Sequence, residues 1–256
     1  MTKKIAVILF PGTNCENETA RAIESVGMKA DIIRWNLAEK LHEYDGYVIP
    51  GGWSYEDRIR AGVISSKDPL MNIIKQEAKK GKPVLGICNG CQVLAETGLI
   101  PGLKDEIEMA LAPNKNPFVS GFYCTWVNLK VSSKKKGAFS LAFSKDEIIK
   151  MPIAHGEGRF ATTEKDLLKK LIANDQILFR YCDNDGNILD EFPINPNGAI
   201  YNIAGITNKQ GNVLALMPHP ERASYLRQVP EQHTKGEESA LAIKIFESMK
   251  TYLENA

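Results

Sequence analysis

The chain has 256 residues, of which 43% are hydrophobic and 25% are charged, and these proportions are ordinary for a soluble globular protein. The formal net charge is +1 at pH 7, so bulk charge does not indicate a nucleic-acid or membrane-surface partner. The first apolar run is expected to be a strand, because a membrane span needs roughly 18 apolar residues. The five cysteines are odd in number and scattered, so no disulfide framework is expected and a cytoplasmic location is predicted.

The first hundred residues alternate between short apolar runs and helix-like patterns. After Lys4, residues 5–10 form an unbroken apolar run, which is typical of a buried parallel strand. Thr13 or Asn14 is expected to cap the next helix, and Gly27 to end it. The alternation predicts an α/β fold, with an open, mostly parallel central sheet and helices on both faces. The predicted elements of this half are strands at 4–10, 30–35, 46–50 and 84–87, and helices at 16–26, 69–80 and after residue 88.

The pattern changes after residue 102. Residues 118–131 alternate between polar and β-forming residues, which predicts added antiparallel strands. No internal repeat or linker is visible, so residues 1–256 are expected to form a single domain. Further predictions are a strand at 148–154, a helix at 165–173, a long surface loop at 183–198, a hairpin at 203–217, an unassigned polar segment at 223–236 and an amphipathic helix at 238–253.

Gly86-Ile87-Cys88-Asn89-Gly90 is the most informative short motif. It lies between a predicted strand and a predicted helix, and Gly-x-Cys-x-Gly has the form of a nucleophile elbow with cysteine in place of serine. The helix N-terminus would favour the thiolate of Cys88. Two other interpretations remain open: Cys88 is a buried packing residue, or Cys88 and Cys91 form a redox pair.

In an open parallel sheet, sites form where strands end at their carboxyl edge. Three loops therefore compete for the site: residues 11–15, residues 51–55 and the turn at Cys88. A Gly-Gly pair such as Gly51-Gly52 is most often only a turn. Beside the cysteine, however, it can aim backbone N–H groups at a developing oxyanion.

A nucleophilic cysteine needs a base, and the chain has four histidines. His42 and His233 lie in polar stretches and are expected at the surface. His155 and His219 each end an apolar strand. His219-Pro220-Glu221 is the stronger candidate, because an extended segment lets the carboxylate reach Nδ1 of the imidazole. The alternative is a structural histidine at a strand end.

Together these segments resemble the class I (triad) glutamine amidotransferases. Within that class they are most similar to the glutaminase subunits of phosphoribosylformylglycinamidine synthase, which acts in purine biosynthesis. The matching stretches cover nearly the whole chain in order: residues 10–15, 50–57, 86–92, 154–158 and 217–222.

The resemblance implies a hydrolytic role for three residues. Cys88 would attack the side-chain amide of glutamine and form a thioester, His219 would transfer protons, and Glu221 would orient His219. Gly51, Gly52 and Asn89 would then serve the oxyanion, and Gln92, Gly156 and Glu157 would bind glutamine.

The resemblance also implies the partners. The chain lacks a Gly-x-x-x-x-Gly-Lys-Ser/Thr loop and any evident metal cluster, so no cofactor or metal is expected in it. ATP and Mg would be bound by a large synthetase subunit, accompanied by a small accessory subunit, with neither nucleic acid nor membrane involved. The alternatives are a Cys88/Cys91 dithiol redox protein of a related α/β fold and, less favoured, a non-catalytic scaffold.

Overall fold

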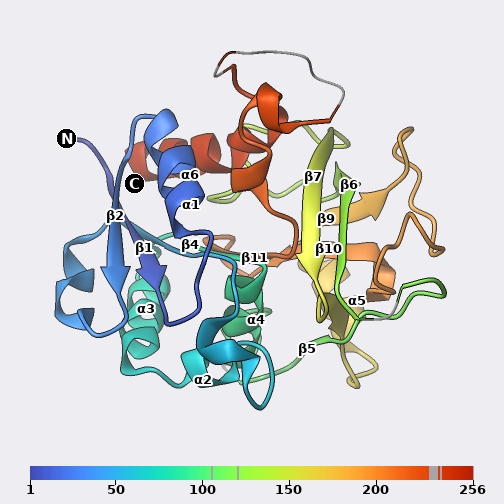
Figure 1. The fold of residues 1–256 in the computed structure, drawn as a ribbon, viewed down its shortest axis with the longest axis horizontal. Helices are drawn as coiled ribbons and strands as arrows, with labels where there is room; N and C mark the ends of the chain where they lie inside the picture. The colour runs from blue at the N-terminus through green and yellow to red at the C-terminus, as the bar shows by residue number, and fades with distance from the viewer. Residues whose placement is uncertain (105, 120, 231–235, 237, 256) are drawn as a thin grey trace.

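A nine-stranded sheet runs through the molecule in the order β2-β1-β3-β4-β11-β10-β9-β6-β7 (Figure 1). The computed structural model describes residues 1–104, 106–119, 121–230, 236 and 238–255. The strands from β2 to β11 are parallel, and those from β11 to β7 pair antiparallel. The predicted α/β class is confirmed, and the antiparallel strands extend the same sheet. The strands are β1 (Lys4–Leu9), β2 (Lys29–Arg34), β3 (Gly46–Ile49), β4 (Val84–Ile87), β6 (Tyr123–Val131), β7 (Ile148–His155), β9 (Ile177–Cys182), β10 (Ile203–Thr207) and β11 (Val213–Leu216), with β5 (Ala110–Ala112) and β8 (Arg159–Ala161) forming a separate pair.

Helices cover both faces of the parallel half. In Figure 1, α1 and α6 lie on one face of the sheet, and α3 and α4 lie on the other. Residues of α6 pack tightly on the sheet, since a methyl group at Gly46 would lie 2.6 Å from Cε of Met249. The helices are α1 (Glu16–Ser25), α2 (Val63–Ser66), α3 (Pro69–Lys79), α4 (Asn89–Glu96), α5 (Leu167–Ala173) and α6 (Lys244–Glu254).

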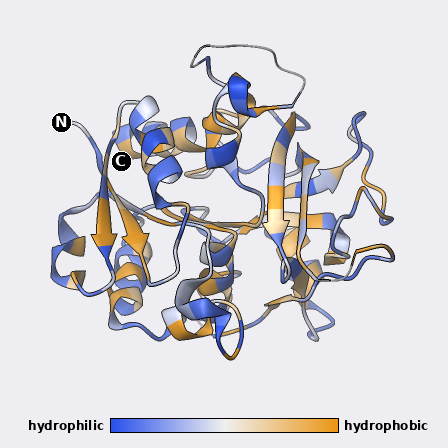
Figure 2. Cartoon of the chain, viewed as in Figure 1, coloured by the Kyte–Doolittle hydropathy of each residue, from blue (hydrophilic) through white to orange (hydrophobic). Residues whose placement is uncertain are grey.

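The hydrophobic pattern explains this layering. All residues of β3, β4 and β11 are buried, as their unbroken apolar runs predict, and these central strands carry the hydrophobic colour in Figure 2. In α3, the buried residues Leu70, Ile74 and Ala78 recur every four positions and face the sheet. Asp68 caps this helix by accepting a hydrogen bond from the backbone N–H of Leu70, and Pro69 follows at its first position.

Some local predictions were wrong. Neither Thr13 nor Asn14 caps α1; Cys15 is the N-cap residue and makes no side-chain capping bond. The Thr13 hydroxyl instead accepts a hydrogen bond from the Phe10 N–H at 3.2 Å. The closing helix begins at Lys244 after a 3₁₀ turn, η6 (Leu241–Ile243), and not at residue 238.

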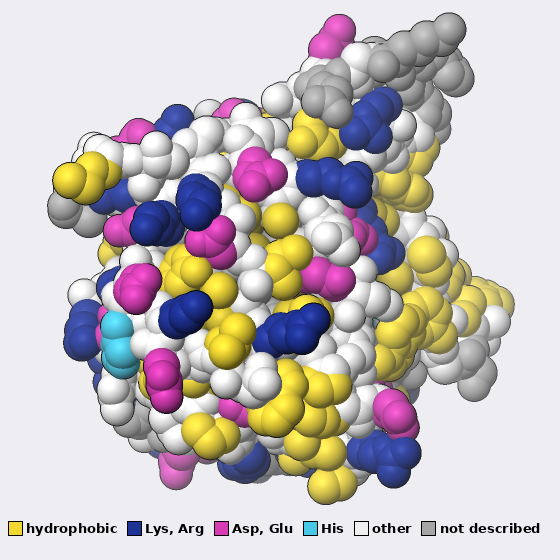
Figure 3. Space-filling view, turned by 60° about the vertical axis from the view of Figure 1, so that its left-hand side comes forward, with side chains coloured by type: hydrophobic (Ala, Val, Ile, Leu, Met, Phe, Trp, Pro, Cys, Tyr) yellow, Lys and Arg dark blue, Asp and Glu magenta, His cyan; other side chains and the backbone are white. Residues whose placement is uncertain are grey.

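The surface is mixed in charge. On the face drawn in Figure 3, lysine and arginine side chains are interspersed with aspartate and glutamate. His42 is exposed, as expected, whereas His233 lies outside the described residues. Among the residues that the structure describes, no helix is both long enough and apolar enough to cross a membrane.

Candidate active site

The three loops that compete for the site in the sequence lie together in the structure. The loops after β1 and β3 and the turn after β4 border one cavity of about 400 Å³. Cys88, His219, Gln92 and Glu157 line it, so the cavity contains most of the predicted site residues. Its opposite wall comes from the antiparallel half, around the end of β7.

Cys88 lies in a strained turn between β4 and α4. Its φ of 51° and ψ of −105° are unusual for a residue with a side chain, which is the geometry expected of a nucleophile elbow. The flanking glycines are required by crowding: a methyl group at Gly86 would lie 2.5 Å from the Gly90 carbonyl oxygen, and one at Gly90 would lie 1.9 Å from that of Ile49. The Cys88 sulfur lies 3.6 Å from the Ala154 carbonyl oxygen across the cavity.

His219 follows β11 and is 2% exposed. Its Nδ1 lies 2.6 Å from Oε1 of Glu221, which is 1% exposed. The pair does not form through an extended segment, as the sequence suggested, because Pro220–Arg222 is a 3₁₀ turn (η4) that brings the carboxylate back to the ring. Burial alone would lower the pKa of His219, but the charges of Glu221 and Cys88 outweigh it and raise the pKa well above its ordinary value.

Gly51 lies directly beside Cys88 and His219. A methyl group at this position would lie 2.8 Å from Cε1 of His219 and 3.3 Å from Cβ of Cys88. Gly52 lines the cavity with a φ of 146°, which a side chain would strain. Asn89 is the first residue of α4, so its backbone N–H has no partner within the helix.

The predicted glutamine-binding residues form a hydrogen-bonded group across the cavity. Gln92 Nε2 donates to the backbone oxygen of Glu157 at 2.7 Å, and its Oε1 accepts from Asn89 Nδ2 at 2.9 Å. Asn89 Nδ2 also donates to Asp57 Oδ1 at 3.0 Å. Burial and the charge of Glu157 raise the pKa of Asp57 to about 6. Gly156 lies next to Glu157 on the cavity wall.

His155 and Cys91 take no part in the His219 pair. His155 is buried, its Nδ1 lies 3.0 Å from Asn114 Oδ1, and burial lowers its pKa to about 3, so the ring is neutral. Cys91 is fully buried in α4, and burial raises the pKa of its thiol well above the ordinary value. A buried, protonated thiol does not favour the dithiol interpretation.

Several cavity residues escaped sequence analysis. Cys15 and Arg222 lie beside His219, and Trp53 and Phe122 stack at the cavity with ring centroids 5.7 Å apart. The available signal for Cys15 is its position in the loop after β1, which is one of the three loops that the sequence proposes for the site. Phe122 precedes an antiparallel strand whose partner and register the sequence does not reveal.

An α/β sheet whose central strand ends in a strained cysteine, beside a buried histidine–carboxylate pair, defines a cysteine-dependent enzyme. Comparison with known proteins agrees. Residues 2–253 match the family model of the CobB/CobQ-like glutamine amidotransferase domain. The chain belongs to this glutamine amidotransferase family.

Sequence similarity to known proteins extends over nearly the whole chain. A protein of Methanothrix thermoacetophila named phosphoribosylformylglycinamidine synthase subunit PurQ is 48% identical, with 98% of each chain covered. The protein of the same name from Pyrococcus furiosus is 41% identical, over 98% of this chain and 99% of that one. Among solved structures, that of PurLQS from Thermotoga maritima matches with a TM-score of 0.77 and 32% identity, over 99% of this chain and 100% of the matched chain.

Proposed function

We propose that this chain is the glutaminase subunit of a phosphoribosylformylglycinamidine synthase. It hydrolyses the side-chain amide of glutamine and delivers ammonia to an ATP-dependent synthetase subunit in purine biosynthesis. Full-length similarity to proteins named as subunits of that synthase supports this proposal. The observation that carries it is the position of Cys88: its backbone turn is strained, and its thiol lies in a cavity beside the buried His219–Glu221 pair.

The chemistry follows from these three side chains. His219 takes the thiol proton, and the Cys88 sulfur attacks the amide carbon to give a tetrahedral intermediate. His219 returns a proton to the departing ammonia, which leaves a γ-glutamyl thioester. Water then attacks the thioester, His219 accepts its proton and returns it to the sulfur, and glutamate leaves. Glu221 fixes the ring orientation and stabilises the imidazolium at each stage.

Two glycines and the first turn of α4 serve the oxyanion in this proposal. Backbone N–H groups of Gly51 or Gly52 and of Asn89 are the candidate donors, because these residues surround the Cys88 turn. Loss of one such donor typically costs about 3 kcal/mol of transition-state stabilisation. Gln92 of α4, with Gly156 and Glu157 of the opposite wall, holds the amino-acid end of glutamine.

In this proposal, partner chains carry out the ATP-dependent part of the reaction. In this proposal the chain needs no cofactor, and ATP and Mg belong to a large synthetase subunit assisted by a small accessory subunit. The proposal places the complex in the cytoplasm. Channelling to the synthetase would keep ammonia from escaping, so we expect little glutaminase activity from the chain alone.

A diazo-ketone analogue of glutamine tests the nucleophile. After exposure of the full chain, with and without the synthetase, peptide mass mapping should find one adduct, on Cys88. Excess glutamine should block the adduct and His219→Ala should abolish it. Cys124 is the internal control, since it is an exposed thiol of the same cavity that iodoacetamide should label regardless of His219.

Two results would overturn the proposal. One is an unlabelled Cys88 in both settings while Cys124 reacts with iodoacetamide. The other is a Cys88–Cys91 disulfide with no adduct, which would favour the redox alternative.

A further inference from the structure

One carboxylate of the cavity has no part in the proposed mechanism. Asp57 ends the 3₁₀ turn η2 (Ser54–Asp57) in the loop after β3, and it is a partly buried residue of the cavity wall. Its Oδ1 accepts a hydrogen bond from Asn89 Nδ2 at 3.0 Å, and among the described residues its Oδ2 has no partner. Because Asn89 directly follows Cys88, the Asp57 carboxylate lies within the length of one side chain of the nucleophile turn.

The backbone that carries Asp57 is strained. Tyr55, Glu56 and Asp57 have φ values of 53°, 60° and 51°. Residues with side chains adopt this left-handed conformation at a cost in free energy, and such strain is concentrated at functional sites. Glu56 does not explain the strain, because its carboxylate is exposed and pairs with Arg58 at 2.7 Å. Of the three residues, the structure places Asp57 on the cavity wall.

A second carboxylate lines the same cavity. Glu157 comes from the opposite wall, and its Oε2 is buried without a hydrogen-bond partner among the described residues. The Arg60 guanidinium is near enough for its charge to act on Glu157, but it is bound by Glu96 at 2.6 and 2.9 Å. Burial, together with the charge of Glu157, raises the pKa of Asp57 to about 6. Two acidic groups therefore repel each other in the cavity, and no ammonium or guanidinium of the described residues forms an ion pair with either.

The amide side chains between the two acids are already hydrogen-bonded. Asn89 Nδ2 donates to Gln92 Oε1 at 2.9 Å as well as to Asp57. Gln92 Nε2 in turn donates to the Glu157 backbone oxygen at 2.7 Å, and Asn89 Oδ1 accepts from the Ser54 N–H at 3.1 Å. A ligand that enters this part of the cavity therefore meets ionised carboxylate oxygens, which can only accept hydrogen bonds, and this favours a cationic donor.

We propose that Asp57 and Glu157 together bind the α-ammonium group of glutamine, so that Asp57 makes the site selective for a free amino acid. An ammonium group brings N–H donors and a positive charge, which match the open carboxylate oxygens and remove the repulsion between the two acids. With the amino-acid end held there, the side-chain amide extends toward Cys88. This inference rests on the proposed function, because it takes glutamine to be the substrate.

Steady-state kinetics of the full chain in complex with its synthetase test the role of Asp57. Glutamine is the substrate, and 4-carbamoylbutanoate, which is glutamine without its α-amino group, is the competitive inhibitor. The inhibitor should bind the wild type at least about tenfold more weakly than glutamine does, because it leaves the two carboxylates without a cation. Asp57→Asn should raise the KM for glutamine at least about tenfold, while kcat and the inhibition constant of 4-carbamoylbutanoate each change less than about threefold.

Two further variants locate the effect. Glu56→Gln is the matched control, because its carboxylate lies in the same strained run but is exposed and pairs with Arg58, so this variant should keep the wild-type KM. Glu157→Gln removes the other carboxylate and should show the same pattern as Asp57→Asn. Circular dichroism shows whether each variant is folded.

Three results would overturn the inference. The first is a KM of Asp57→Asn within about twofold of the wild-type value. The second is an equal weakening of glutamine and 4-carbamoylbutanoate in Asp57→Asn, which would mean that Asp57 only supports the cavity wall. The third is the same rise in KM in Glu56→Gln. The diazo-ketone analogue separates this inference from the proposed function: a wild-type chain without a Cys88 adduct would refute the function, whereas an adduct together with any of these three results would refute the inference alone.

Discussion

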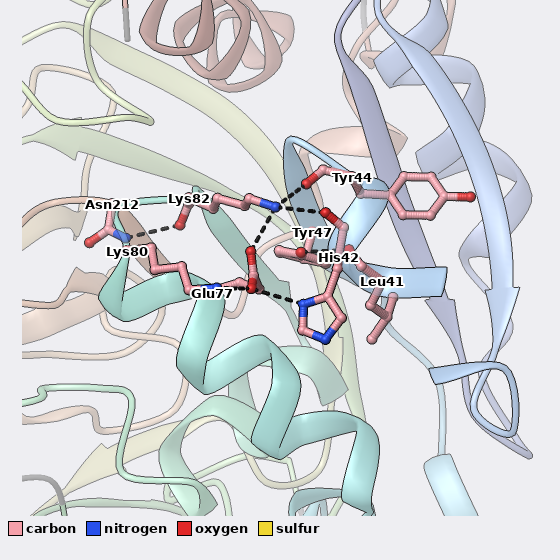
Figure 4. Close-up of polar contacts among 8 residues, drawn as sticks. All are labelled: Leu41, His42, Tyr44, Tyr47, Glu77, Lys80, Lys82 and Asn212. Atoms are coloured by element: carbon pink, nitrogen blue, oxygen red, sulfur yellow. Dashed lines mark hydrogen bonds and ion pairs between the residues drawn. The ribbon is translucent and has the colours of Figure 1, made fainter. Parts of the chain in front are cut away.

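Glu77 offers a quantitative test of how the parallel half is held together. This carboxylate of α3 is 2% exposed, and Figure 4 shows it at the centre of a group of charged side chains. It lies 2.6 Å from Lys80 Nζ, 2.7 Å from Lys82 Nζ and 3.0 Å from His42 Nδ1. Lys82 Nζ also donates to the Tyr44 carbonyl oxygen at 2.6 Å, so the group joins α3 to the segments that lead into β3 and β4.

The pKa of Glu77 gives the size of the expected effect. Burial alone would raise this pKa, but hydrogen bonds with Lys80, Lys82 and His42, together with the charge of Lys82, outweigh burial and lower the pKa from 4.5 to about 2. A difference of this size corresponds to about 3 kcal/mol of folding free energy. Lys80 and His42 are more than half exposed, so solvent screening reduces the expected contribution to about 2 kcal/mol.

The perturbation is Glu77→Gln, measured by urea unfolding at several pH values. A carboxylate whose pKa is lowered by folding stabilises the protein above its unfolded pKa, and this contribution disappears as the pH falls through the folded value. The variant should therefore be about 2 kcal/mol less stable at pH 7 and at pH 5.5, and the difference should shrink between pH 4.5 and about pH 2. Glu254→Gln is the control, because that exposed carboxylate pairs with Lys250 at a distance of 3.9 Å, and its loss should change stability by less than about 0.5 kcal/mol. Equal stability of Glu77→Gln and wild type at pH 7, or a deficit that does not shrink below pH 4.5, would refute the reasoning.

Two further substitutions test the cavity. Gly51→Ala should lower the glutamine-dependent kcat of the complex by about 100-fold, because the added methyl group must displace the His219 ring or the Cys15 sulfur, and a change in kcat within twofold would contradict this. Asp57→Asn should raise the thermal unfolding temperature at pH 8 but not at pH 4. Burial and the charge of Glu157 raise the pKa of Asp57 in the folded protein from 3.8 to about 6. Ionisation of Asp57 therefore lowers the stability of the folded protein as the pH rises through this range, and asparagine avoids that loss. A variant with the same unfolding temperature as wild type at pH 8 would show that Asp57 carries no such cost.

The sequence predicts the nucleophile turn well because local sterics determine it. Gly86 is required by its contact with Gly90 inside the same strand, turn and helix, whereas Gly90 is required by its close approach to Ile49 of β3. The short segment therefore contains most of the signal, because both glycines stand in it. The same holds for the layering of the parallel half, where unbroken apolar runs can be buried only between two layers of helices. The sequence correctly predicts that Glu221 contacts His219, but it predicts an extended backbone where the structure has a 3₁₀ turn. Both backbone conformations can place the carboxylate near the imidazole ring.

The sequence predicts the other wall of the cavity less well because distant pairings determine it. β9 was missed altogether, although it joins β10 to β6 in the sheet. Phe122 and Cys124 reach the cavity only because Tyr123 pairs with His155 in the β6–β7 ladder. A shift of one residue in such a ladder turns every side chain to the other face, and nothing within either strand specifies the partner.

The two halves of the sheet therefore contribute different parts of the site: the parallel half holds the reacting groups, and the antiparallel half forms the opposite wall. Cys88 and His219 follow adjacent parallel strands whose register, from Val84 opposite Val213 to Ile87 opposite Leu216, fixes the sulfur and the imidazole relative to each other. The antiparallel half approaches through single hydrogen bonds, such as His219 N–H to the Pro152 oxygen at 2.9 Å. Because β4 and β11 are fully buried, they hold the reacting groups more rigidly than the strand ends and loops hold the substrate wall. Changes in the antiparallel wall should therefore alter the binding of glutamine before they alter the chemistry at Cys88.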